Sequence, residues 1–101
     1  MVIVAGEFVV GPGERDAFLA SKEEGMRRSR AEAGCLEYTF SADPLDPGRV
    51  LLFERWESQQ ALDAHLAALA GAPGAGVPAG VTPTRSEIRL FDVSGERSLG
   101  G

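Results

Sequence analysis

The stretch FERWESQQALDAHL, residues 53–66, gathers a carboxylate, an indole and an imidazole that could do chemistry together. If its first part is a strand, Glu54 and Trp56 lie two residues apart and share one face. His65 follows where a helix could fold back over that face. An imidazole exchanges protons near neutral pH, and an indole N–H donates a hydrogen bond. These three residues are therefore candidates for the wall of a small-molecule pocket.

Each candidate also has a purely structural interpretation. A tryptophan on a strand more often fills the core, and a lone histidine on an apolar helix face is more often a packed core residue. Glu54 is harder to explain as packing, because an inward carboxylate is costly unless it is paired. We expect Glu54 either to bond with His65, Tyr38 or an arginine, or to reach water in a pocket. Tyr38 is expected at the edge of the core, with its hydroxyl in a cavity or at the surface.

Hydrophobic periodicity and turn residues predict six elements. The predicted strands cover residues 2–10, 35–42, 49–57 and 84–93, and the predicted helices cover 14–33 and 59–70. The segment DPLDPG (43–48) has the composition of a hairpin turn, and Ser58 is a suitable N-cap for the second helix. Gly34 stands where a glycine commonly follows a helix end.

The element order β-α-β-β-α-β predicts an α+β, ferredoxin-like fold. Right-handed crossovers would place both helices on one face of a four-stranded antiparallel sheet. We expect one domain over residues 1–94 and a flexible C-terminal tail over 95–101. Residues 71–83 contain seven Gly or Pro among thirteen, too many for a stable helix, so both a lid and a plain connection stay open.

The first and third strands indicate a second copy of the chain. VIVAGEFVV and VLLF are apolar at nearly every position. The strands of a sheet with one solvent-exposed face should instead alternate apolar and polar residues. Two helices cover only one face. The simplest cover for the other face is an identical sheet, which predicts a homodimer with a sheet-on-sheet interface.

Several large side chains are expected to line the space between sheet and helices. On the second strand we favour the set Leu36, Tyr38 and Phe40 as helix-facing over Cys35, Glu37 and Thr39, because it is bulkier. Phe8, Leu52 and Leu62 would complete an apolar wall around Glu54, Trp56 and His65. Such a half-apolar cavity with a few ionisable groups is typical of a small-molecule site, but it does not name a reaction.

Composition narrows the class of protein. The chain has 101 residues, 44% hydrophobic and 25% charged, with a net charge of −5. These values indicate one soluble domain and argue against nucleic acid or an anionic membrane as a partner. No apolar run is long enough for a membrane span, and the N-terminal segment has no signal-peptide pattern. The single cysteine, Cys35, and the absence of zinc-ligand spacing favour a metal-free protein of the reducing cytoplasm.

The segments EAGCLEYTF (32–40) and LFERWESQQALDAHL (52–66) resemble the antibiotic biosynthesis monooxygenase family, which includes quinol monooxygenases. The similarity extends more weakly to VAGEFVVGPGERDAFLA and EIRLFDV, and so covers most of the chain. The combination of Gly-Cys-x-x-Tyr with Glu-x-Trp-x-Ser-x-x-Ala-Leu-x-x-His is specific for the family more than for one activity. The resemblance implies a dimeric α+β barrel.

It also implies oxygenation of a quinol or polycyclic aromatic by dioxygen without a cofactor. His65 would be the base or orienting group, and Trp56 would wall the pocket and donate to a substrate oxygen. Tyr38 and Glu54 would be secondary polar contacts, and Phe8, Leu52 and Leu62 the apolar lining.

Two departures from the family pattern limit this transfer. The chain has no second histidine, which many members carry, and its first strand has no asparagine, which the haem-degrading branch pairs with its tryptophan. Two alternatives to a monooxygenase therefore stay open. One is a non-catalytic dimeric barrel that binds a small hydrophobic metabolite. The other is an isomerase, which would need a wetter pocket than Leu36, Phe8, Leu52 and Leu62 suggest.

Overall fold

The computed structural model describes residues 1–71 and 81–101. Its strands are β1 (Val2–Val9), β2 (Cys35–Ala42), β3 (Arg49–Trp56) and β4 (Arg85–Asp92), and its helices are α1 (Arg15–Arg30) and α2 (Gln59–Gly71). The six predicted elements are confirmed, with boundaries that differ by a few residues. Most of the glycine- and proline-rich segment, for which sequence leaves a lid and a connection open, falls at 72–80, outside the described residues.

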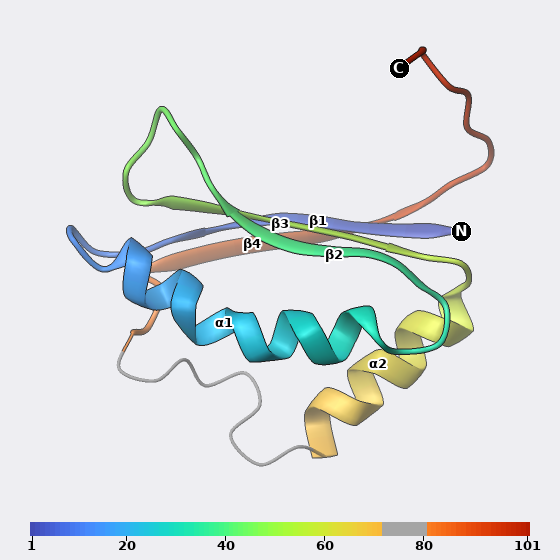
Figure 1. Cartoon of the computed structure of the whole chain (residues 1–101), viewed down its shortest axis with the longest axis horizontal. Helices are drawn as coiled ribbons and strands as arrows, with labels where there is room; N and C mark the ends of the chain where they lie inside the picture. Colours follow the sequence, from blue (N-terminus) through green and yellow to red (C-terminus); the bar gives the residue numbers. More distant parts are fainter. Residues whose placement is uncertain (72–80) are drawn as a thin grey trace.

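The strands form one antiparallel sheet in the order β2-β3-β1-β4. Figure 1 shows α1 and α2 on the same side of this sheet, and the chain after β4 leading away from it. The predicted α+β, ferredoxin-like arrangement is therefore confirmed. None of the described helices is long and apolar enough to cross a membrane.

Two local features fix where α2 begins. The Ser58 hydroxyl accepts a hydrogen bond from the backbone N–H of Ala61 at 3.1 Å, which confirms the predicted N-cap. Gly34 has a φ of +83°, and a Cβ added there would lie 2.5 Å from the Ala61 Cβ. Only glycine fits this left-handed turn against the first turn of α2. The end of α1 and the start of α2 are thereby held close together.

The core lies between the helices and the sheet in two adjoining clusters. One contains Val2, Val4, Tyr38, Leu52, Trp56 and Leu62. The other contains Val10, Phe18, Val50 and Val81, and both Phe8 and Phe40 pack against the two clusters. Burial of these side chains is the main stabilising contribution that holds the helices on the sheet.

The other face of the sheet carries apolar side chains without a helix over them. Ladder alternation places Ile3, Ala5 and Phe53 on this face, opposite the inward Val4 and Leu52. Phe53 is 39% exposed and Phe91, which pairs with Ile3, is 50% exposed. The predicted excess of apolar residues on two faces is thus present in the fold.

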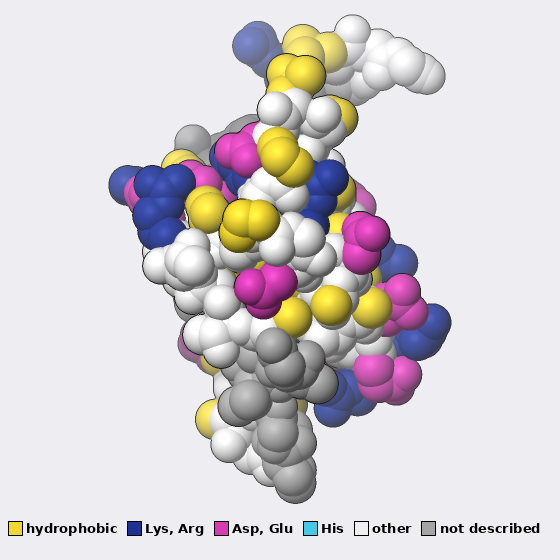
Figure 2. All heavy atoms as spheres, turned by 90° about the vertical axis from the view of Figure 1, so that its left-hand side faces the viewer, with side chains coloured by type: hydrophobic (Ala, Val, Ile, Leu, Met, Phe, Trp, Pro, Cys, Tyr) yellow, Lys and Arg dark blue, Asp and Glu magenta, His cyan; other side chains and the backbone are white. Residues whose placement is uncertain are grey.

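Charged side chains gather at one end of this face. The guanidinium of Arg49 bonds the carboxylates of Glu7 at 3.1 Å and Asp43 at 3.0 Å, and Arg85 reaches Glu7 at 3.3 Å. Figure 2 shows basic and acidic side chains interspersed over the end of the molecule that lies on the left in Figure 1. No patch of a single sign dominates that view.

Candidate functional site

Strand β3 places Glu54 and Trp56 on the face that the helices cover. Trp56 is fully buried and Glu54 is 5% exposed. The indole N–H of Trp56 donates a hydrogen bond of 2.9 Å to Oε1 of Glu54. This bond gives the inward carboxylate a partner that sequence reasoning did not name, since His65, Tyr38 or an arginine was expected. It also uses the donor that the family resemblance assigned to a substrate oxygen.

Helix α2 brings His65 onto the tryptophan. The imidazole is 2% exposed, and its centroid lies 4.7 Å from that of the Trp56 ring at an interplanar angle of 34°. The Tyr38 ring meets the other rings edge-on, 5.3 Å from the imidazole and 6.5 Å from the indole. The structure therefore brings Tyr38, Glu54, Trp56 and His65 together, as the sequence predicts.

Glu32 completes this cluster and was not predicted as a site residue. Its Oε1 lies 2.7 Å from Nδ1 of His65. Glu32 stands in the turn after α1, two residues before Gly34, so the close packing of that turn on α2 sets the contact. The only signal in the sequence was its position at the start of the EAGC motif.

A cavity of about 440 Å³ lies beside this cluster, between the sheet and α2. Its apolar wall consists of Val4, Phe8, Phe40, Leu52, Leu62, Leu66, Leu69, Ile88 and Leu90, and its polar groups are Lys22, Tyr38, Glu54, His65 and Arg89. Six of the seven predicted site residues line it, and the seventh, Trp56, packs against His65. The half-exposed Ile88 and Leu90 place the cavity along β4, whose side chains the helices leave uncovered.

His65 also borders a second, smaller hollow of about 230 Å³ between the two helices. Gly25, Arg28, Ser29, Glu32, Ala68 and Leu69 line this hollow. Glu32 therefore borders the hollow between the helices and not the larger cavity, whereas His65 borders both.

Burial shifts the protonation of the groups around the cavity. Desolvation raises the pKa of Glu54 above its ordinary value, and the indole hydrogen bond and His65 partly offset the rise. Desolvation, followed by the charge of Glu54, raises the pKa of Tyr38 to about 12. Tyr38 is therefore a neutral phenol at physiological pH and can donate or accept a hydrogen bond.

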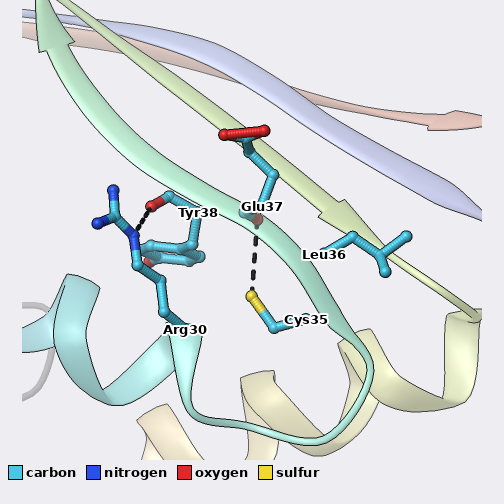
Figure 3. Close-up of a pocket in the computed structure, with 5 residues that line it drawn as sticks. All are labelled: Arg30, Cys35, Leu36, Glu37 and Tyr38. Atoms are coloured by element: carbon cyan, nitrogen blue, oxygen red, sulfur yellow. Dashed lines mark hydrogen bonds between the residues drawn. The ribbon is translucent and has the colours of Figure 1, made fainter.

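The expectation for Leu36 is wrong. A bulge between Cys35 and Glu37 shifts the register of β2, so that Cys35 pairs with Trp56 and Tyr38 pairs with Glu54. Leu36 is 46% exposed, and Figure 3 shows it pointing to the side, away from the helix layer. Cys35 packs against the core in its place. Simple alternation does not anticipate the extra residue.

Cys35 is a free thiol in a shallow hollow at the edge of β2. Its Sγ donates to the carbonyl of Glu37, and Arg30 donates to the carbonyl of Tyr38 (Figure 3). Burial, and next the charge of Glu32, raises the pKa of the Cys35 thiol, which disfavours a reactive thiolate. Within residues 1–71 and 81–101, no group of three or more His, Cys, Asp or Glu side chains is placed to hold a metal ion.

Fold and cavity together define a ferredoxin-like α+β domain whose helices and sheet line an open hollow of small-molecule size. The sequence model of antibiotic biosynthesis monooxygenases matches residues 1–70. The chain belongs to the antibiotic biosynthesis monooxygenase family.

Relatives and solved structures agree with this assignment. The chain is 36% identical over 64 residues to the uncharacterized protein sll1783 of Synechocystis, and 38% identical over 64 residues to Rv0793 of Mycobacterium tuberculosis, which carries a provisional monooxygenase name. These matches span 63% of this chain, but only 44% and 62% of the two relatives.

The solved structure of Rv0793 superposes with a TM-score of 0.78 at 28% identity, covering 96% of this chain and 98% of the other. A Deinococcus radiodurans protein, provisionally named an antibiotic biosynthesis monooxygenase, gives a TM-score of 0.80 at 24% identity with full coverage of both chains. The latter similarity shows the fold alone.

Proposed function

We propose that this protein is a monooxygenase that oxidises a quinol or related polycyclic aromatic with dioxygen and without a resident cofactor. The observation that carries the proposal is that His65, in contact with Glu32, lies at the wall of a mainly apolar cavity. An aromatic substrate fits such a wall, and a histidine held by a carboxylate is suited to remove a phenolic proton.

The Glu32 contact determines which nitrogen of His65 acts. An ionised carboxylate only accepts hydrogen bonds, so Nδ1 is the nitrogen that carries the proton in the neutral ring. Nε2 then has its lone pair available, and it makes no hydrogen bond to any residue within the described ranges. In this proposal, Nε2 accepts the proton of a substrate hydroxyl in the cavity that His65 lines.

The substrate supplies the electrons in this proposal. Loss of a phenolic proton to His65 gives an electron-rich quinolate, which reduces dioxygen. For a naphthoquinol the overall change is quinol plus O₂ to hydroxyquinone plus water, with one oxygen atom in each product. The protein removes the proton, orients the ring and limits access of water.

The remaining side chains have supporting roles. Tyr38 and Glu54 offer polar contacts at the cavity wall, and Phe8, Leu52 and Leu62 provide apolar contact with the ring. Trp56 is a positioning residue, because its ring packs on His65 and its N–H holds Glu54.

We also propose that two copies associate through the face of the sheet that lacks helices. The exposed Phe53 and Phe91 would be covered by the partner's sheet, which is the sheet-on-sheet packing expected for such a surface. The cytoplasm is the compartment we propose, since the half-buried Cys35 is the only cysteine.

The experiment that tests the function is oxygen uptake by the purified protein with reduced naphthoquinones and anthrones in chelator-treated buffer. Catalysed uptake above the spontaneous rate, with hydroxylated product, supports the proposal. Thermal stabilisation by these compounds without any catalysed uptake would instead assign the protein to non-catalytic binding of a hydrophobic metabolite. The mainly apolar cavity wall gives no support to an isomerase of a polar metabolite.

A further inference from the structure

Lys22, the only lysine in the sequence, lies on the wall of the cavity. Its Nζ is 5.2 Å from the centroid of the Phe18 ring and 5.5 Å from that of the Phe40 ring. Phe18 precedes it by one helical turn on α1. Two aromatic faces therefore hold the ammonium group in place through cation–π attraction.

This ammonium group has no carboxylate partner. No ion pair or hydrogen bond joins Lys22 to any side chain of residues 1–71 and 81–101, and residues 72–80 contain no acidic residue. Burial also lowers the pKa of Lys22 from its ordinary value. A partly desolvated cation at the wall of an apolar cavity gains most from an anionic ligand.

The sheet register shows how far Lys22 lies from the proposed base. The Phe40 ring, which Lys22 contacts, belongs to a residue that pairs with Leu52. The next cross-strand pair on the same face of the sheet is Tyr38 with Glu54. Successive cross-strand pairs on one face, two residues apart along a strand, are separated by roughly 7 Å. The His65 ring stacks on Trp56, which follows Glu54 as the next residue of β3 on this face. The cation and the base therefore lie toward opposite ends of the cavity, with the Tyr38–Glu54 pair between them.

We infer that Lys22 binds an anionic group of the ligand, and that the ligand is an aromatic acid whose carboxylate lies opposite its hydroxyl. The inference rests on the proposed function only for the role of the hydroxyl.

Calorimetric titration with a matched pair of redox-stable probes tests the inference. The probes are 6-hydroxy-2-naphthoate and 2-naphthol, which share ring and hydroxyl and differ by one carboxylate at the far end. We expect the parent protein to bind the acid roughly five- to tenfold more tightly, as for a charged contact in a partly exposed site. This preference should decrease as salt is added.

Three variants assign the preference to Lys22. Lys22→Met should bind both probes equally, and Lys22→Arg should keep the preference for the acid. Arg27→Met removes one positive charge from the same helix at an exposed position outside the cavity, where Arg27 pairs with Glu23 and Glu24, and should leave the preference unchanged. Lys22→Gln serves as a second neutral variant where Lys22→Met is unfolded by circular dichroism.

Equal binding of the two probes by the parent protein, no binding of either probe, or an undiminished preference in the neutral variants would overturn the inference. The titration needs no turnover. A protein that prefers the acid through Lys22 but consumes no oxygen would contradict the proposed function and leave this inference standing.

Discussion

Nδ1 of His65 lies 2.7 Å from Oε1 of Glu32, although the two residues are 33 positions apart in the chain. The contact joins the turn after α1 to the middle of α2. It depends on Gly34, whose left-handed conformation lets the turn pack against Ala61. The orientation of the proposed base is therefore set by the joining of two helix ends and by the Trp56 ring beneath it.

Replacement of Glu32 by Gln should lower kcat while the fold is retained. The amide has no negative charge to stabilise the imidazolium that forms when His65 takes a proton. We expect a loss of roughly 10- to 100-fold, the order seen when a metal-bound histidine loses its carboxylate partner. Steady-state oxygen uptake measures the loss. A Glu32→Gln protein with the kcat of the parent would show that the pair has no part in turnover.

Substitution of Gly34 by Ala should destabilise the protein by roughly 1–3 kcal/mol. Alanine would have to adopt the positive φ of Gly34, and its Cβ would overlap the Cβ of Ala61. Gly25→Ala in the middle of α1 is the matched control, because a Cβ there meets nothing within 4 Å. This control should instead stabilise by about 0.5–1 kcal/mol. Urea denaturation of both variants gives the comparison, and equal effects would refute the role of the turn.

The stability that Glu54 contributes should depend on pH. Burial raises its pKa in the folded protein above the ordinary value of 4.5, so the folded state retains a proton that the unfolded chain releases. The contribution is fully present below about pH 4.5 and is lost as the pH rises through the raised pKa. In Glu54→Gln the amide oxygen can still accept the hydrogen bond of the indole N–H. The amide does not titrate, so its contribution to stability does not fall as the pH rises.

The variant should therefore gain in free energy of unfolding relative to the parent between about pH 4 and about pH 7. Urea denaturation at the two pH values measures the difference. Glu96→Gln, in the exposed C-terminal segment, corrects for the loss of one negative charge. A constant difference between Glu54→Gln and the parent across this range would contradict the raised pKa.

Phe53→Glu should separate the proposed dimer. The substitution places a charge at an exposed apolar position of the sheet face that lacks helices. We expect the dissociation constant to rise roughly 30-fold or more, the equivalent of about 2 kcal/mol. Leu45→Glu is the control, because Leu45 is 94% exposed in the 43–48 turn. Sedimentation analysis compares the two variants, and a monomeric parent protein would rule out the dimer.

The residues that sequence reasoning placed correctly follow regular periodicity. Strand alternation put Glu54 and Trp56 on one face, and helical spacing turned His65 inward. Leu36 was misplaced because a bulge adds a residue that alternation does not reveal.

The residues that were missed lie where periodicity carries less information. Glu32 is a turn residue, and its contact with His65 arises only when two distant helix ends pack. Lys22 lies at four-residue spacing from Phe18 and Met26 on α1, but lysine side chains are mostly exposed, and Lys22 was not among the predicted site residues. Because the long lysine side chain can lie along an apolar surface, helical spacing alone could have placed Lys22 among the residues that line the cavity.

The most direct test of His65 as the base compares oxygen uptake by the parent protein and by His65→Ala, with reduced 2-methyl-1,4-naphthoquinone in metal-free buffer. His65→Gln, which leaves a smaller void, serves as a second variant, and circular dichroism confirms that each is folded. We expect catalysed uptake by the parent and a loss of kcat/KM of about 10²- to 10⁴-fold in both variants, the usual contribution of a general base. Folded variants as active as the parent, or a parent that consumes no oxygen beyond the spontaneous rate, would contradict it.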